Sequence, residues 1–459
     1  MSGKNFGASR CVRKAALALG VSCGLCGWGG LCPAVLANTT AAAAATDPQQ
    51  LAQVSQESRP GERYRLARDA LQMPQAPERP PAASWTRDDA LDTRIPDASP
   101  FSDRQPSSQF QAVMPAPRLR MALLLPLRSS TLKSAAEMVR DGFKAAHLRD
   151  GAGIDLDVIE TDDGAQNIVA AYRTAAATHD VLIGPLSRSA VGALAASGVV
   201  DRPTIALAQP ESAADGSGIL PPHMLVMGLS IEEEARQAAA WAARENGASK
   251  ALVVSTSVTW QKRAARAFIN RWQRSGAPAD VIELSVSGSF LNGAALAQLK
   301  KRLQADPPAF LFVALDEAQT RQLRAAVDPG LVLYGTSQLN SLNLAEVAGA
   351  EKRPELDGVR LLDLPWQLQA DHPAVMVYPH AVTTGAARRI PDLERLYALG
   401  IDAFRVAAEI GAGHGRFTID GVTGRLTVQF DAIGPAFFER LEQPAIYTDG
   451  VVLPVATGP

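Results

Sequence analysis

Three short motifs in this 459-residue chain have the residue types of a serine acyl-transfer site. Ser130-Thr131-Leu132-Lys133, Ser341-Leu342-Asn343 and Thr383-Thr384-Gly385 follow the order of the S-x-x-K, S-D-N and K-T-G motifs of penicillin-recognising enzymes. The third motif lacks its lysine, and the serine of the first would lie in a loop after a parallel strand. That pattern does not belong to the enzyme fold, so the sequence predicts no catalytic residue and no enzyme activity.

The patterns of a metal, cofactor or nucleic-acid site are not found either. The six histidines are scattered, with no H-x-x-x-H pair. The four cysteines all lie near the start, at Cys11, Cys23, Cys26 and Cys32. No phosphate-binding or dinucleotide-binding glycine motif follows the first expected strand. We therefore expect no metal and no cofactor, and the net charge of -2 gives no reason to expect nucleic acid.

Polar side chains at the ends of expected strands could bind a small polar ligand, because ligands of open parallel sheets bind beyond the carboxyl ends of the strands. The candidates are Ser187, Ser189, Gln209, Trp260, Asp316, Ser337 and Gln338. The two serines could hold a carboxylate at a helix N-terminus, and Asp316 could pair with an ammonium group. Each has a structural alternative: Ser187 could cap its helix, Asp316 could start the next one, and Trp260 could pack beside the core.

The elements that must position these side chains alternate between strand and helix. Strands are expected at 119–125, 154–159, 180–183, 204–208, 250–255, 281–286, 309–315 and 331–334. Helices are expected at 167–177, 187–197, 231–246, 260–272, 294–303, 318–327 and 391–410, and a hairpin at 416–430. Such alternation with short connections predicts parallel sheets covered on both faces, arranged as two lobes.

The first 117 residues have a different character. Residues 1–37 are typical of a secretory signal, with a basic start, an acid-free apolar stretch and Val35-Leu36-Ala37 before the cleavage point. A lipoprotein signal with lipidation at Cys23 is the alternative, although Gly20 stands where leucine is usual. Residues 38–117 are rich in Pro, Ala and Gln without an apolar period, so we expect a disordered tether. The chain is thus expected in the periplasm, reaching a membrane only through an N-terminal lipid.

Several segments resemble known proteins. Residues 122–127, Arg140-Asp141-Gly142-Phe143 and residues 180–187 resemble type I periplasmic binding proteins. A more specific marker is the run at 396–404 followed by Ile419-Asp420-Gly421-Val422-Thr423-Gly424-Arg425-Leu426. This marker is similar to the C-terminal part of the LppC family, the bacterial penicillin-binding protein activators. The best-known members carry a helical-repeat domain before this module, where this chain has the Pro-rich segment.

The resemblance implies an α/β, type I periplasmic-binding-protein-like fold of two doubly wound parallel-sheet lobes joined by three crossings. We place these crossings near Ser230, Pro365 and Gly413. Lobe one is then 118–229 plus 366–412, and lobe two is 230–365 plus 413–455.

The resemblance also implies a non-enzymatic protein that stimulates a peptidoglycan synthase, a penicillin-binding protein, from the periplasmic side, usually while anchored to the outer membrane. The alternative function is a periplasmic solute-binding receptor for an amino acid or a similar small polar ligand. Trp366 is expected either to contact the partner or to pack at a crossing. A receptor requires polar groups that converge from both lobes, and this requirement separates the two functions.

Overall fold

We describe the chain from a computed structural model, for residues 118–162, 164–210, 220–341, 352–380, 390–431 and 434–456. The expected signal, Cys23 and the expected tether lie outside the described residues, as does most of the second and third acyl-transfer-like motifs. None of the described helices is long and apolar enough to span a membrane.

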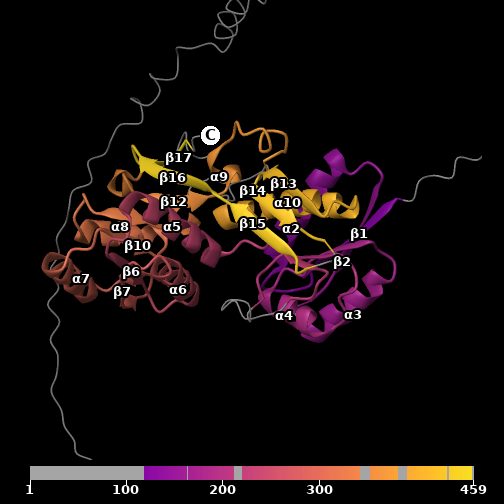
Figure 1. Cartoon of the computed structure of the whole chain (residues 1–459), viewed down its shortest axis with the longest axis horizontal. Coiled ribbons are helices and arrows are strands. Elements are labelled where there is room, and N and C mark those ends of the chain that lie inside the picture. Colours follow the sequence, from indigo (N-terminus) through magenta and orange to yellow (C-terminus); the bar gives the residue numbers. More distant parts are fainter. Residues whose placement is uncertain are drawn as a thin grey trace, which may run out of the picture. The chain divides into compact units, whose positions relative to one another are not determined.

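The first sheet has five parallel strands in the order β2-β1-β3-β4-β5 (Figure 1). They are β1 (Leu119–Leu125), β2 (Ile154–Glu160), β3 (Val181–Ile183), β4 (Thr204–Ala206) and β5 (Met224–Val226). Along β1, Met121 and Leu123 belong to one apolar core, whereas Ala122 and Leu124 belong to another. The strand is therefore buried on both faces, which explains its continuous apolar sequence.

Four helices cover this sheet. α2 (Lys133–Asp150) and α10 (Pro391–Gly411) pack on one face, and α3 (Ala165–Ala176) and α4 (Arg188–Ala196) on the other. A Cβ at Gly142 of α2 would overlap the carbonyl oxygen of Tyr397, and one at Gly400 of α10 would overlap that of Val139. The two helices thus meet backbone to backbone, and only glycine fits at these two positions.

The second sheet has seven strands in the order β17-β16-β12-β11-β10-β6-β7. They are β6 (Ala251–Ser255), β7 (Ala279–Glu283), β10 (Phe310–Val313), β11 (Val332–Tyr334), β12 (Arg360–Asp363), β16 (Gln443–Thr448) and β17 (Val451–Pro454). The first five are parallel, whereas β16 and β17 are antiparallel additions at one edge. This edge was not expected from the sequence, because each strand is short and contains a proline, which is uncommon within a sheet.

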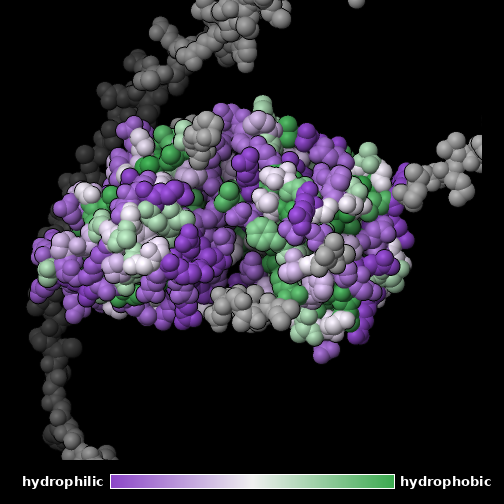
Figure 2. Space-filling model, viewed as in Figure 1, coloured by the Kyte–Doolittle hydropathy of each residue, from purple (hydrophilic) through white to green (hydrophobic). Residues whose placement is uncertain are grey.

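Helices cover both faces of the second sheet as well. α5 (Ile231–Asn246) and α6 (Thr259–Gln273) pack on one core, and α7 (Gly293–Ala305) and α8 (Glu317–Ala326) pack on the other. The surface over α6 and α7 is mostly hydrophilic (Figure 2), as the charged outer faces of amphipathic helices require. Short elements complete this part: β8 (Val286–Ser287), β9 (Phe290–Leu291) and the 3-10 helices η2 (Ser337–Leu339) and η4 (Pro354–Leu356).

A third, antiparallel sheet corrects the expected division of the chain. The predicted hairpin is confirmed as β13 (Arg416–Gly421) and β14 (Gly424–Gln429), and β15 (Phe437–Leu441) extends it. We expected residues from 413 onwards in lobe two. The inner side chains of β13 and β14, including Ile419 and Leu426, instead join the apolar core of the first sheet and α10. The last crossing therefore lies between β15 and β16, not at Gly413.

Candidate functional site

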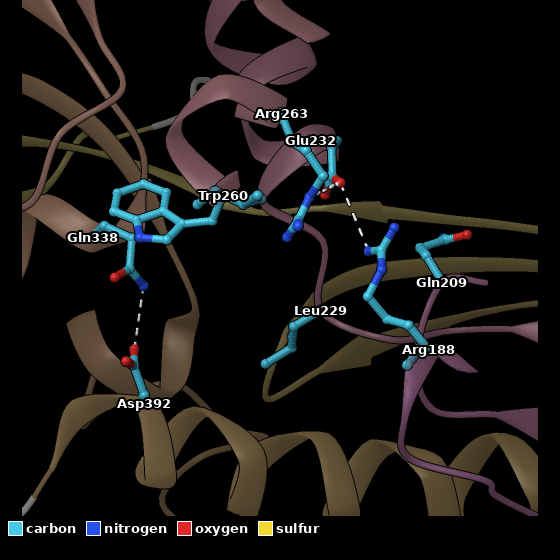
Figure 3. Close-up of a pocket in the computed structure, with 10 residues that line it drawn as sticks. Arg188, Gln209, Leu229, Glu232, Trp260, Arg263, Gln338 and Asp392 are labelled. Carbon is cyan, nitrogen blue, oxygen red and sulfur yellow. Dashed lines mark hydrogen bonds and ion pairs between the residues drawn. The ribbon is translucent and has the colours of Figure 1, made fainter. Parts of the chain in front are cut away.

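A hollow of about 390 Å³ lies where strands of both sheets end (Figure 3). Three predicted ligand residues line it: Gln209 after β4, Trp260 at the start of α6 after β6, and Gln338 in η2 after β11. Because all three follow the carboxyl ends of parallel strands, the topology brings together residues that are far apart in the sequence. We call this space the strand-end hollow.

Four charged residues of the strand-end hollow were not among the predicted site residues: Arg188, Glu232, Arg263 and Asp392. Arg188 opens α4, and Glu232 lies in the first turn of α5, where an acidic side chain favours the helix dipole. Arg263 lies one helical turn after Trp260, so both face the same side of α6. That spacing was visible in the sequence, but nothing in the sequence indicated that Glu232 would lie beside the two arginines.

Glu232 is shared by arginines from both lobes. Arg263 Nε donates to Glu232 Oε1 at 2.8 Å, and Arg188 Nη1 lies 3.7 Å from the same oxygen. Ser230 Oγ donates to the other oxygen at 3.1 Å. The Glu232 side chain is 9% exposed, against 27% for Arg188 and 34% for Arg263. One buried carboxylate thus holds the Arg263 guanidinium and lies near that of Arg188, and this end of the hollow carries a net positive charge.

The opposite end of the strand-end hollow is already neutralised. Gln338 Nε2 donates to Asp392 Oδ1 at 3.3 Å, and Arg395 Nη1 donates to the same oxygen at 2.8 Å. Among the described residues that line the hollow there is no nucleophile paired with a base, and no described His, Cys, Asp or Glu cluster could hold a metal. The arrangement can bind an anion.

The remaining predicted ligand residues have structural partners of their own. Ser187 caps α4, because its Oγ accepts from the backbone N–H of Ala190 at 3.2 Å, and the exposed Ser189 lies beside it. Asp316 caps α8 in a capping box with Gln319. Asp316 lies in a second, smaller hollow of about 270 Å³ beside η2. None of these three side chains lines the strand-end hollow.

Ser337 belongs to a buried network that ties α10 to the second sheet. Arg395 of α10 donates through Nε and Nη2 to both oxygens of Asp363 at the end of β12, at 3.0 and 2.7 Å. Its Nη2 also donates to the carbonyl oxygens of Ser337 and Asn340. Burial opposes the charge, but Asp363 and Asp392 together raise the pKa of Arg395. A side chain of the protein itself thus fills the strand ends beside Ser337.

A second buried arginine ties β15 to the first crossing. Arg440 donates through Nη2 and Nη1 to the carbonyl oxygens of Met227 and Gly228, at 2.8 and 3.1 Å, and through Nε to Thr423 Oγ1. Thr423 in turn donates through its N–H and its hydroxyl to Asp402 of α10. The two segments that suggested the LppC resemblance, 396–404 and 419–426, therefore contact each other through Asp402.

Two buried carboxyl groups lie between these arginines. Glu234 accepts from the backbone N–H of Ser337 at 2.8 Å, and Glu442 has a buried Oε2 with no hydrogen-bond partner among the described residues. Burial raises the pKa of Glu234 to about 7. Burial and the charge of Glu234 raise the pKa of Glu442 well above its usual range. The first and third crossings between the lobes thus meet at two carboxyl groups whose pKa values are raised by burial.

Trp366 is not available to a partner. It lies in α9 (Pro365–Leu368), is 1% exposed, and packs in the first core against His380 and Tyr397. Its indole N–H donates to Glu394 at 3.1 Å. Of the two roles expected from the sequence, packing at a crossing is the one that this geometry favours.

Comparison with known proteins places this arrangement in a family. Residues 109–433 match the family model LppC, described as "LppC putative lipoprotein". A curated relative, "Penicillin-binding protein activator LpoA" of Haemophilus ducreyi, is 29% identical over 67% of this chain. The match covers 50% of that relative, so the chain spans about half of its length.

Solved structures share the fold. The structure of "a putative branched-chain amino acid ABC transporter" from Chromobacterium violaceum is 32% identical, with a TM-score of 0.57 over 72% of this chain and 100% of that one. The LpoA C-domain from Haemophilus influenzae, a regulator of PBP1A, is 23% identical, with a TM-score of 0.57 over 73% of this chain and 100% of that one. Full-length LpoA from the same organism is 22% identical, with a TM-score of 0.59 over 74% of this chain and 59% of that one.

Proposed function

Because the chain belongs to the LppC family, we propose that it is a non-enzymatic regulator that activates a penicillin-binding protein by direct contact in the periplasm. The observation that carries this proposal is the family match over residues 109–433, together with a curated relative named as a penicillin-binding protein activator. The target would be a peptidoglycan synthase. Lipid attachment at Cys23 would hold the protein at the outer membrane.

The contacts of the predicted ligand residues favour a regulator over an amino-acid receptor. A receptor for a free amino acid needs one unsatisfied group for the carboxylate and another for the ammonium. Asp316, the predicted ammonium partner, caps α8, and Asp392 is already paired with Arg395 and Gln338. Among the described residues of the hollow, no carboxylate is left without a partner.

The buried arginines also oppose the hinge motion of a receptor. Arg395 joins α10 to the end of β12, and Arg440 joins β15 to the first crossing. Opening the lobes at α10 would separate the buried Arg395 from its counter-ion Asp363, and this costs several kcal/mol. A regulator that presents a fixed surface has no need of such a motion.

The test is reconstitution with a purified bifunctional penicillin-binding protein from the same organism. We expect the mature chain to bind the synthase and to increase its rate of glycan polymerisation or cross-linking in proportion to its occupancy. A solute-binding protein of the same fold, at equal concentration, is the control. The proposal would be refuted if the chain neither bound nor stimulated any of the organism's synthases.

The alternative, a solute receptor, keeps one supporting observation: the strand-end hollow lies where receptors of this fold class bind their ligands. It predicts that a free amino acid at about 100 times its Kd would raise the melting temperature by several degrees. We expect no shift from any of the standard amino acids.

A further inference from the structure

We propose that the strand-end hollow binds a carboxylate of a peptide ligand, held between Arg188 of the first lobe and Arg263 of the second. The choice of a peptide rests on the proposed function, since a peptidoglycan synthase acts on glycan chains that carry short acidic peptides.

Arg263 is held in an orientation that suits an anion. Its Nε is engaged by Glu232 at 2.8 Å, and its terminal nitrogens have no partner among the described residues. In Figure 3 the terminal end of Arg263 points into the space between Trp260 and Arg188. A guanidinium fixed through Nε presents its two terminal nitrogens as a fork, the geometry that binds both oxygens of a carboxylate. Glu232 is therefore a positioning residue for Arg263.

Arg188 provides a second cation from the opposite lobe. Its contact with Glu232 is loose, at 3.7 Å, so it can turn toward a ligand without breaking a strong ion pair. Since Glu232 is the one carboxylate shared by both arginines, an anion between them would restore charge balance. A ligand held by both arginines would also bridge α4 and α6, and so connect the two lobes.

The neutral walls suit a peptide rather than a bare ion. Trp260 offers an aromatic face, and Gln209 and Gln338 offer carboxamides that can pair with peptide N–H and C=O groups (Figure 3). The hollow, about 390 Å³, is in the range of sites for small organic ligands. Among the described residues that line the hollow, an ammonium group finds no free carboxylate, so the ligand is a peptide whose N-terminus is blocked or attached to a sugar.

The experiment uses the mature full chain and two probes: muramyl dipeptide, which has one free carboxylate, and a sugar-linked stem tetrapeptide. Each is compared with its carboxyl-amidated counterpart by isothermal titration calorimetry and by melting temperature. We expect the acidic probes to bind and raise the melting temperature by a few degrees, and the amidated probes to bind at least about tenfold more weakly, the effect of losing a charge-assisted hydrogen bond.

Three variants locate the site. Arg188→Gln and Arg263→Gln are each expected to weaken binding at least about tenfold. Arg266→Gln removes an exposed arginine from the same helix outside the hollow and should leave Kd unchanged. Arg188→Gln keeps the test decisive if Arg263→Gln folds poorly, because the Arg188 contact in the unliganded protein is loose.

The outcomes separate this inference from the proposed function. Three results would each overturn the inference, even if the protein stimulates a synthase. They are no binding of either acidic probe, equal binding of the amidated forms, and an equal loss of affinity in Arg266→Gln. Carboxylate-dependent binding that is lost in Arg188→Gln supports the inference. If no synthase responds while this binding is observed, only the proposed function fails.

Discussion

The network around Arg395 and the strand-end hollow both place arginines at the ends of sheet strands, yet the two differ in charge balance. Arg395 is almost fully buried and donates to both oxygens of Asp363 and to two backbone carbonyl groups. Arg188 and Arg263 are partly exposed and share one carboxylate. The first arrangement is complete within the protein, whereas the second has unused hydrogen-bond donors.

The difference follows from the cost of burying charge. A fully buried guanidinium is tolerated only when counter-ions and carbonyl oxygens satisfy its donors, so Arg395 must be structural. A guanidinium in contact with water loses little when its terminal donors lack protein partners. Such donors can therefore be kept for a ligand, and arginine sites in this fold can be classified by how completely the protein itself satisfies them.

The largest expected effect tests the complete site. Asp363→Asn leaves Arg395 buried without its counter-ion, and we expect the free energy of unfolding to fall by about 3–5 kcal/mol. Asp392→Asn is the matched control: it pairs with the same arginine, but its side chain is 63% exposed, so about 1 kcal/mol or less is expected. Chemical denaturation measures both. Equal losses in the two variants would contradict the distinction between the sites.

A second effect concerns the carboxyl groups beside Arg395. Burial raises the pKa of Glu234 from 4.5 to about 7, so the folded state keeps this proton to a higher pH than the unfolded chain does. The free energy of unfolding should therefore fall as the pH rises from about 4.5 to 7, and Glu234 alone should contribute about 3 kcal/mol to this fall. The charged groups around Glu234 are Glu233, Asp363, Arg395, Arg440 and Glu442.

Glu234→Gln isolates this effect, because the amide oxygen can still accept from the N–H of Ser337. The variant should lose the part of the decrease that comes from Glu234, whereas the part that comes from Glu442 should remain. Glu233→Gln, in the same turn of α5 but with a side chain 42% exposed, should keep it. Denaturant melts of the three proteins at pH 4.5, 6 and 8 make the measurement. A wild-type stability that does not fall across this range would refute the prediction.

A smaller effect distinguishes a helix cap from a ligand group. Asp316→Ala removes the N-cap of α8 and should cost about 1 kcal/mol, whereas Asp316→Asn preserves the cap and should cost little. Neither substitution should change the Kd of the acidic peptide probes, because Asp316 lies outside the strand-end hollow. A changed Kd with unchanged stability would instead indicate that Asp316 contacts the ligand.

The smallest effect is expected at the hollow itself. Arg188→Gln removes a partly exposed charge with one loose contact, so the free energy of unfolding without ligand should change by no more than about 0.5 kcal/mol. The same substitution is the one expected to weaken ligand binding most cleanly. A large loss of stability would show that Arg188, like Arg395, is part of the folded framework.

Local sequence was sufficient for much of the fold. The run Leu119–Leu125 predicted a strand buried on both faces, and the alternation after it predicted most of the parallel strands and their covering helices. β5 and β12 were not predicted, because strands of three and four residues are too short to show a period. The hairpin was predicted, but its place was not, since apolar residues in β13 and β14 suit either core equally well.

What the sequence determined by itself was the type of most elements and the family resemblance, because apolar periodicity and short motifs are local properties. Tertiary structure alone decided which polar residues meet. Arg188, Glu232 and Arg263 come from three elements, and only the packing of the two sheets places one carboxylate beside both guanidinium groups. The same packing turned Ser187 and Asp316 into helix caps and buried Trp366. Polar side chains act through partners that are distant in the chain, so their roles depend on contacts that no local pattern encodes.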